Sequence, residues 1–189
     1  VGLRPASAPG PGEHGGMTVT YEIRPIEPEV LGQLRERDDA GHPPRLLVDD
    51  EGGSPLRCCL RPVRPGEQVA LVSYAPLRRW AAETGAQPGP YDEVGPVFIH
   101  PHPCPGPEKK GFPNGLGDCR RVLRAYAPDG RIRGGRLVEP DPSGAGVPAK
   151  AALDELFADP GVALVHVRAV EFGCFTFEAR RTGEVGRPG

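Results

Sequence analysis

The stretch GVALVHVRAVEFGCFTFEAR, residues 161–180, decides the fold because its pattern predicts a β-hairpin. Alternate side chains of a strand point to the same face. A three-residue loop at 171–173 keeps the apolar residues of both arms on one face and gives Gly173 the left-handed position that such a loop favours. The apolar set that we expect in the core is Val165, Val167, Ala169, Phe175, Phe177 and Ala179.

The polar residues of the same hairpin gather on its other face. The register pairs Val170 with Cys174, Arg168 with Thr176 and His166 with Glu178. It therefore brings together His166, Arg168, Cys174 and Glu178. Two interpretations stay open: a solvated sheet surface with an Arg–Glu pair, or the wall of a site.

The length and composition predict one domain. A chain of 189 residues with 38% hydrophobic content can bury one core. We expect a disordered segment at 1–17, a single α+β domain at 18–181 and a flexible tail at 182–189. Residues 1–16 are too poor in apolar area to pack, so the native chain is expected to start at Met17, or Val1 to be a translated alternative start codon.

Charge and residue usage exclude several classes of partner. The formal net charge is −2, so no basic field attracts nucleic acid or an anionic membrane. No apolar run is long enough to span a bilayer, and no signal segment is visible, which predicts a cytoplasmic protein. Arginine, glycine, proline and alanine predominate, as in proteins of GC-rich bacterial genomes. The sequence leaves the oligomeric state open.

The five cysteines are expected to be reduced thiols. Their number is odd, and the predicted compartment is reducing. Cys58 and Cys59 are adjacent in a predicted strand, where their side chains would point to opposite faces.

The other predicted elements complete an α+β fold. We expect an antiparallel or mixed sheet of seven to eight hairpin-linked strands, with two or three short helices. Helices are predicted to begin at Pro28, Pro76 and Pro148, because proline suits the first helical position. Predicted strands and hairpins cover 18–26, 45–49, 57–63 with 68–75, 96–100, and 120–126 with 131–138. A long loop, 101–118, separates the last two groups.

The sequence has no Walker loop, no dinucleotide glycine fingerprint, no nucleophile elbow, no zincin helix and no Cys-x-x-Cys pair. The segment His100-Pro101-His102-Pro103-Cys104 is the strongest remaining chemical signal. An extended backbone puts its two imidazoles and its thiol on one side, whereas polyproline II separates them. Imidazole and thiolate are ligands that zinc or iron prefers. The candidate metal ligands are His100, His102, Cys104, His166 and Cys174.

Two other interpretations of these residues stay open. His166 could activate Cys104 or Cys174 as a nucleophile, which makes these three the candidate catalytic residues. Alternatively, the histidines are satisfied by local hydrogen bonds, and the thiols serve as small apolar groups.

Several arginines could hold a small-molecule ligand with a carboxylate or phosphate group. These are Arg57, Arg61, Arg120, Arg121 and Arg168, of which Arg57 and Arg168 are the candidate cofactor-binding residues. The alternative for most of them is ordinary surface solvation.

From about Tyr21 to Arg180, the chain resembles a bacterial family known as domain of unknown function 1203. The residues that carry the resemblance are Arg24-Pro25, Asp38-Asp39-Ala40-Gly41, Arg57 with Leu60, Arg64-Pro65-Gly66-Glu67, Leu71-Val72-Ser73-Tyr74, Gly95-Pro96-Val97-Phe98-Ile99-His100 with Cys104, His166-Val167-Arg168 and Gly173-Cys174-Phe175. The resemblance implies no activity, substrate or cofactor.

These observations lead to one functional hypothesis. His100, Cys104, His166 and Cys174 are expected to border one pocket, with Arg168 or Arg57 at its rim. The chain would then be an uncharacterised cytosolic protein with a small-molecule or metal site, and whether it is an enzyme stays open. The alternative is a binding or interaction module with neither a metal nor a catalytic pair.

Overall fold

The computed structural model describes residues 21–113, 116, 119–141, 143 and 148–182. The segment predicted to be disordered, 1–17, lies outside these residues, as does all of the predicted tail after Thr182.

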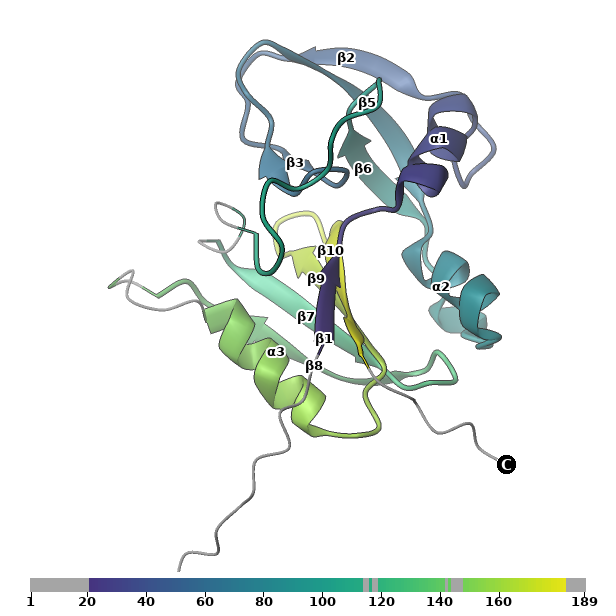
Figure 1. Cartoon of the computed structure of the whole chain (residues 1–189), viewed down its shortest axis with the longest axis vertical. Coiled ribbons are helices and arrows are strands. Elements are labelled where there is room, and N and C mark those ends of the chain that lie inside the picture. The colour runs from purple at the N-terminus through teal and green to yellow at the C-terminus, as the bar shows by residue number, and fades with distance from the viewer. Residues whose placement is uncertain (1–20, 114–115, 117–118, 142, 144–147, 183–189) are drawn as a thin grey trace, which may run out of the picture.

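The strands form two five-stranded sheets, which lie one above the other in Figure 1. Sheet A has the order β1 (Tyr21–Arg24), β10 (Phe175–Arg181), β9 (Leu164–Ala169), β7 (Arg121–Tyr126) and β8 (Ile132–Val138). Sheet B has the order β2 (Arg45–Asp49), β5 (Glu67–Tyr74), β6 (Gly95–Ile99), β3 (Pro55–Leu56) and β4 (Arg61–Pro62). The α+β class is confirmed, but the described residues contain ten strands in two sheets, where seven to eight were predicted.

Three α-helices begin at the prolines that predicted them. They are α1 (Pro28–Glu36), α2 (Pro76–Thr84) and α3 (Pro148–Ala158), and a short 3-10 helix, η1, covers Gly89–Tyr91. Proline is favoured at a helix start because the first turn leaves its N–H groups unpaired in any case. Helix α2 ends at Gly85, whose φ of 78° is in the left-handed region that glycine adopts without strain.

Each sheet has its own hydrophobic core. Helix α3 covers one face of sheet A, where its apolar side chains pack on those of β7, β9 and β10 (Figure 1). Helix α1 packs on sheet B through Leu31 and Leu34. Phe175 of sheet A belongs to the core of sheet B, so the last hairpin joins the two halves.

The last hairpin forms with the predicted register in its outer part only. His166 pairs with Glu178 as predicted, but a bulge lies between Phe175 and Phe177 and places Phe175 opposite Arg168. The Ala169 N–H donates to the Cys174 carbonyl, so the loop has four residues and the predicted pairs of Cys174 and Thr176 are wrong. The extra residue turns Phe175 to the face of His166, while Phe177 stays on the α3 side.

The polar face of this hairpin is not a solvated surface. His166 has 0% exposure and Glu178 is also buried. The ring of Phe175 packs edge-on against His166 and against Tyr74 of sheet B. The interpretation as a surface is therefore wrong for these two polar residues, which are enclosed by other side chains.

The predicted hairpin of 57–63 with 68–75 is wrong, whereas that of 120–126 with 131–138 is confirmed. Strand β5 pairs with β2 on one edge and with β6 on the other, which leaves no edge for residues 57–63. The turn at 64–67 does form, since the Glu67 N–H donates to the Arg64 carbonyl at 3.0 Å. Prolines 55, 62 and 65 remove backbone donors from this segment, so it makes only the two-residue strands β3 and β4.

Candidate functional site

The adjacent cysteines lie in the tight turn between β3 and β4. The Leu60 N–H donates to the Leu56 carbonyl at 2.9 Å, and Leu60 has a φ of 54°, in the left-handed region. Because a turn does not alternate its side chains as a strand does, the Sγ atoms of Cys58 and Cys59 lie 4.0 Å apart. The prediction that they point to opposite faces is therefore wrong.

The end of strand β6 lies beside this turn. Strand β3 pairs in parallel with β6 through Leu56 and Phe98, and the Arg57 N–H donates to the Phe98 carbonyl at 3.0 Å. His100 follows β6 directly, so its backbone N–H reaches Cys58 Sγ at 3.3 Å. Its Nδ1 atom lies 3.3 Å from Cys58 Sγ and 3.9 Å from Cys59 Sγ.

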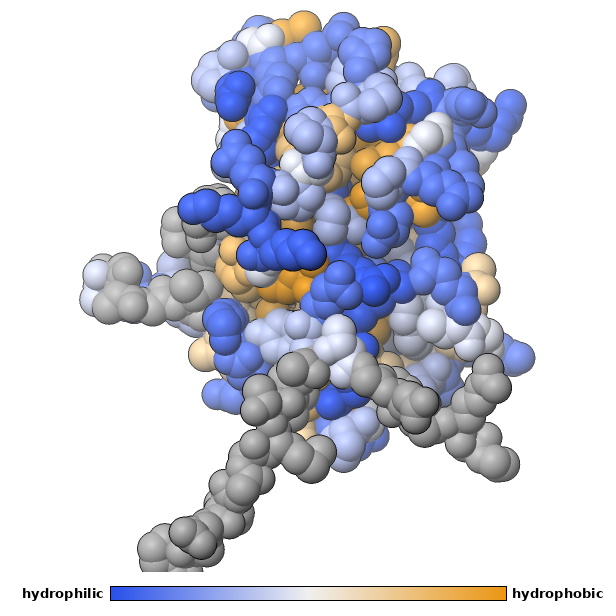
Figure 2. All heavy atoms as spheres, in the orientation of Figure 1, coloured by the Kyte–Doolittle hydropathy of each residue, from blue (hydrophilic) through white to orange (hydrophobic). Residues whose placement is uncertain are grey.

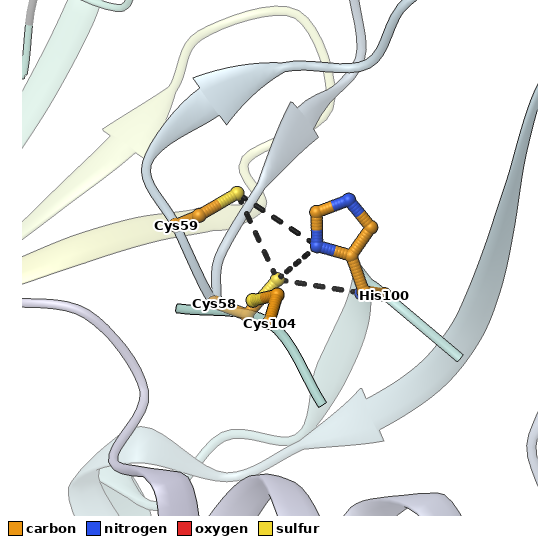
Figure 3. Close-up of side chains that lie close together, drawn as sticks. All are labelled: Cys58, Cys59, His100 and Cys104. Carbon is orange, nitrogen blue, oxygen red and sulfur yellow. Dashed lines mark hydrogen bonds between the residues drawn. The ribbon is translucent and has the colours of Figure 1, made fainter. Parts of the chain in front are cut away.

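Cys104 completes a group that we call the thiol–imidazole cluster, formed by Cys58, Cys59, His100 and Cys104. One ligand atom from each residue lies within 4.8 Å of the other three. Figure 3 shows the four side chains pointing toward one another from the turn and from the segment after β6. The two cysteines of the turn are buried, while His100 and Cys104 are half-buried. The geometry and the residue types suit one metal ion.

Other predicted ligands lie outside the cluster. His102 has an exposed side chain, His166 belongs to strand β9 of sheet A, and the half-buried Cys174 precedes β10. Among the described residues, no group of metal-ligating side chains includes any of them. The expectation that all four residues border one pocket is therefore wrong. His100 and Cys104 lie in the cluster, whereas His166 and Cys174 lie elsewhere.

The far side of the His100 ring contacts an ion pair. Its Nε2 atom lies 3.0 Å from Glu67 Oε1 and 3.0 Å from an Arg61 guanidinium nitrogen. Arg61 donates to both oxygens of Glu67, at 2.8 and 2.5 Å. These hydrogen bonds hold the pKa of Glu67 well below its usual range. A carboxylate behind a histidine is the arrangement that fixes the ring of many metal ligands.

Two further arginines hold the segments that carry the cluster. Arg57 is only 3% exposed and donates from Nε to the Phe175 carbonyl at 2.8 Å and from a terminal nitrogen to the Pro55 carbonyl. Burial lowers its pKa to about 10. Arg35 of α1 donates to the carbonyls of His100 and His102, both at 3.1 Å, and so ties α1 to the segment before Cys104.

The two thiols of the turn differ in acidity. Cys59 accepts a hydrogen bond from the Cys58 thiol and lies close to His100 and Arg61, which lowers the pKa of Cys59 to about 6. That same hydrogen bond, together with burial, raises the pKa of Cys58. One thiolate is therefore favoured in the cluster at neutral pH.

The remaining arginine candidates bind other parts of the chain. Arg168 pairs with Glu93 at 2.9 Å and donates to the Gly173 carbonyl, so it is not at the rim of the cluster. Arg120 pairs with Glu139, and Arg121 donates to the Leu116 carbonyl. Of the predicted arginines, only Arg57 and Arg61 adjoin the cluster.

His166 is not placed to activate a thiol. Within the described residues, neither of its ring nitrogens has a hydrogen-bond partner. Its Nε2 atom lies 3.8 Å from Glu178 Oε2, and the rings of Tyr126 and Phe175 pack edge-on against it. Burial lowers the pKa of His166 well below its ordinary value. The predicted pairing with Cys104 or Cys174 thus has no support in the geometry.

Sequence reasoning named two of the four cluster residues and missed Cys58 and Cys59. Because these two cysteines are adjacent in a segment with a strand-like pattern, their side chains were predicted to point to opposite faces and not to share a site. The prolines at positions 55 and 62 were the available sign that this segment turns.

In the part of the chain that the structure describes, every helix is too short or too polar to cross a membrane.

Searches of curated proteins and of solved structures gave no match. A family model does match, over residues 53–181, and that range contains all four residues of the cluster. Since the match covers most of the chain, the protein belongs to the family described as protein of unknown function (DUF1203).

Proposed function

We propose that the protein binds one zinc or iron ion through Cys58 Sγ, Cys59 Sγ, His100 Nδ1 and Cys104 Sγ. The observation that carries the proposal is the convergence of these four atoms to within 4.8 Å of one another. Each comes from a residue type that prefers these metals.

The spacing of the ligand atoms suits tetrahedral coordination. With Zn–S near 2.3 Å and Zn–N near 2.05 Å, a regular tetrahedron has edges of about 3.8 Å between sulfurs and about 3.6 Å between sulfur and nitrogen. The Cys58–Cys59 distance is 4.0 Å, and His100 Nδ1 lies 3.3 and 3.9 Å from the two sulfurs. Small side-chain rotations would bring these atoms onto one ion.

The residues around the cluster support the same assignment. A proton on His100 Nε2 would be donated to Glu67, which leaves the Nδ1 lone pair for the metal. Three thiolates carry three negative charges and a divalent ion two positive ones, so one negative charge remains. The guanidinium groups of Arg57 and Arg61 offset that charge in a largely buried setting.

The ligand set favours zinc and a structural role. Four protein ligands leave no open coordination position for a substrate or a water molecule. The ion would join the β3–β4 turn to the segment after β6, and the described residues of both lack long strands or helices of their own. Iron is the second choice because tetrahedral sulfur ligation also accommodates it.

A cytosolic location is part of the proposal. All five cysteines are free, and Cys119 is exposed, as is usual where thiols are kept reduced. Zinc or iron binding by Cys58, Cys59 and Cys104 needs those thiols to be reduced.

Metal analysis of the purified full chain tests the proposal. We expect about one equivalent of zinc or iron per chain after purification under reducing conditions, and intense visible absorption after cobalt replaces the native ion. Cys104→Ser should lower the metal content severely, whereas Cys119→Ser, which alters an exposed cysteine outside the cluster, should retain it.

Two results would contradict the proposed metal site. One is a reduced, folded protein that binds neither zinc, iron nor cobalt when these are supplied in excess, which would favour an interaction module without metal. The other is an equal loss of metal in Cys104→Ser and Cys119→Ser.

A further inference from the structure

Strand β2 forms an open edge of sheet B. It is the last strand on its side of the sheet and lies at the top of the molecule in Figure 1. All five of its residues pair with β5 in unbroken register, so the strand is regular along its whole length. Leu46 and Val48 are 56% and 52% exposed, and hydrophobic atoms are visible at the top of Figure 2. An edge of this kind is a template for another strand.

The other sheet edges in the described residues carry the features that discourage strand pairing. Strand β4 has two residues, one of them Pro62. Strand β1 is four residues long and carries the ion pair of Glu22 and Arg24. Strand β8 pairs through a bulge and presents the charged Arg133 and Arg136. Strand β2 has no bulge and no proline, so it stands apart from the other edges.

The sequence of β2, Arg-Leu-Leu-Val-Asp at 45–49, is complementary to itself in the antiparallel direction. If two copies pair about Leu47, Leu46 of each copy faces Val48 of the other. Facing residues of an antiparallel pair lie on the same side of the sheet. The four half-exposed side chains would therefore form one apolar cluster across the junction.

The charges at the two ends of β2 fit the same arrangement. Arg45 is exposed at the start of the strand, and the exposed Asp50 and Glu51 follow its end. An antiparallel junction places Arg45 of each copy beside the acidic end of the other. A parallel junction would instead bring like charges together, which destabilises the pair.

We propose that two copies of this chain associate through β2, which joins their five-stranded sheets B into one continuous sheet. The two-fold axis passes next to Leu47. This inference does not depend on the metal site, which is formed by the β3–β4 turn and the segment after β6.

The molar mass of the purified full chain in solution gives the first test. Sedimentation equilibrium should give a mass near twice the chain mass of 20.1 kDa, with dissociation on dilution. Hydrogen exchange at the backbone amides of β2 should become faster on that dilution, because their new partners are lost. A monomer at every concentration up to the solubility limit would overturn the proposal.

Two double variants test the register with the same pair of positions. In L46K/V48K, four lysines meet at the junction, so the dissociation constant should rise by at least about tenfold. In L46K/V48E, each lysine faces a glutamate of the other copy, and the dimer should persist. Loss of the dimer in both variants, or in neither, would refute the proposed register.

A third variant is a control for exposed apolar side chains in general. Leu137 on edge strand β8 is 56% exposed, the same as Leu46, and L137K should leave the dimer intact. Dissociation caused by L137K would place the interface on sheet A and overturn the assignment to β2. Circular dichroism of every variant checks that it is folded.

Discussion

The Nδ1 atom of His100 lies 3.3 Å from the Sγ atom of Cys58, although 42 positions separate the two residues in the chain. The contact exists because the two-residue strand β3, which ends two residues before Cys58, pairs in parallel with β6, which ends directly before His100. A metal ion at this point would therefore join two segments that are far apart in the chain and would add to the hydrogen bonds that already hold them.

The two histidines of the His-Pro-His segment are expected to behave differently. His100→Ala removes a proposed ligand and should abolish stoichiometric metal binding, while His102→Ala should leave the metal content unchanged because its side chain is exposed and outside the cluster. Metal analysis of the two variants checks this. Equal metal loss in both would show that the segment binds in a different conformation.

Glu67 is expected to tune the affinity of the site. Glu67→Gln keeps the shape of the side chain but removes the charge that orients His100, and should weaken zinc binding by roughly 10- to 100-fold. Competition with a chromophoric chelator measures the affinity. Glu139→Gln, which breaks another Arg–Glu pair on the exposed surface, is the control and should bind zinc like the wild type.

The buried Glu178 should make stability depend on pH. Burial raises its pKa to about 7, and among the described residues its Oε2 has no hydrogen-bond partner, while Oε1 accepts from Arg180. Between the unfolded value of 4.5 and about 7, the folded protein holds a proton that the unfolded chain has released. Stability relative to Glu178→Gln should thus fall as pH rises through this range, by about 3 kcal/mol in all.

The buried His166 should change the stability with pH in the opposite direction to Glu178. Its lowered pKa keeps it neutral in the folded protein, while the unfolded chain binds a proton below 6.5. Stability relative to His166→Asn should therefore rise as pH increases toward 6.5. Urea unfolding at several pH values measures both differences. Two flat profiles would contradict the buried environment of the pair.

The burial of the last hairpin predicts a contrast between two of its phenylalanines. Phe177 is fully buried beneath α3, and Phe177→Ala should cost about 3–5 kcal/mol. Phe172 in the loop is 87% exposed, and Phe172→Ala should change the unfolding free energy by no more than about 0.5 kcal/mol. Chemical denaturation compares them, and similar losses would show that the loop is packed.

The amino-acid sequence by itself determined the elements whose causes are local. Prolines 28, 76 and 148 marked the helix starts, since a fixed φ and a missing N–H suit that position. The alternation of the last hairpin predicted the pairing of His166 with Glu178 and the burial of Phe177. Phe175 is buried as predicted, but on the opposite face, because of the bulge. Family membership also followed from motifs in the sequence, and the comparison confirmed it.

Only the tertiary structure decided where the chemistry lies. The turn that brings Cys58 and Cys59 together depends on a left-handed Leu60, which no glycine or asparagine signals in the sequence. The partner His100 comes from the non-local, parallel pairing of β3 with β6, and local patterns carry no information about such a pairing. His166 is buried because Tyr126 and Phe175 pack against it, and Phe175 in turn packs against Tyr74 of sheet B, formed by a distant part of the chain. Alternation alone could not tell whether that face was solvated or part of a site.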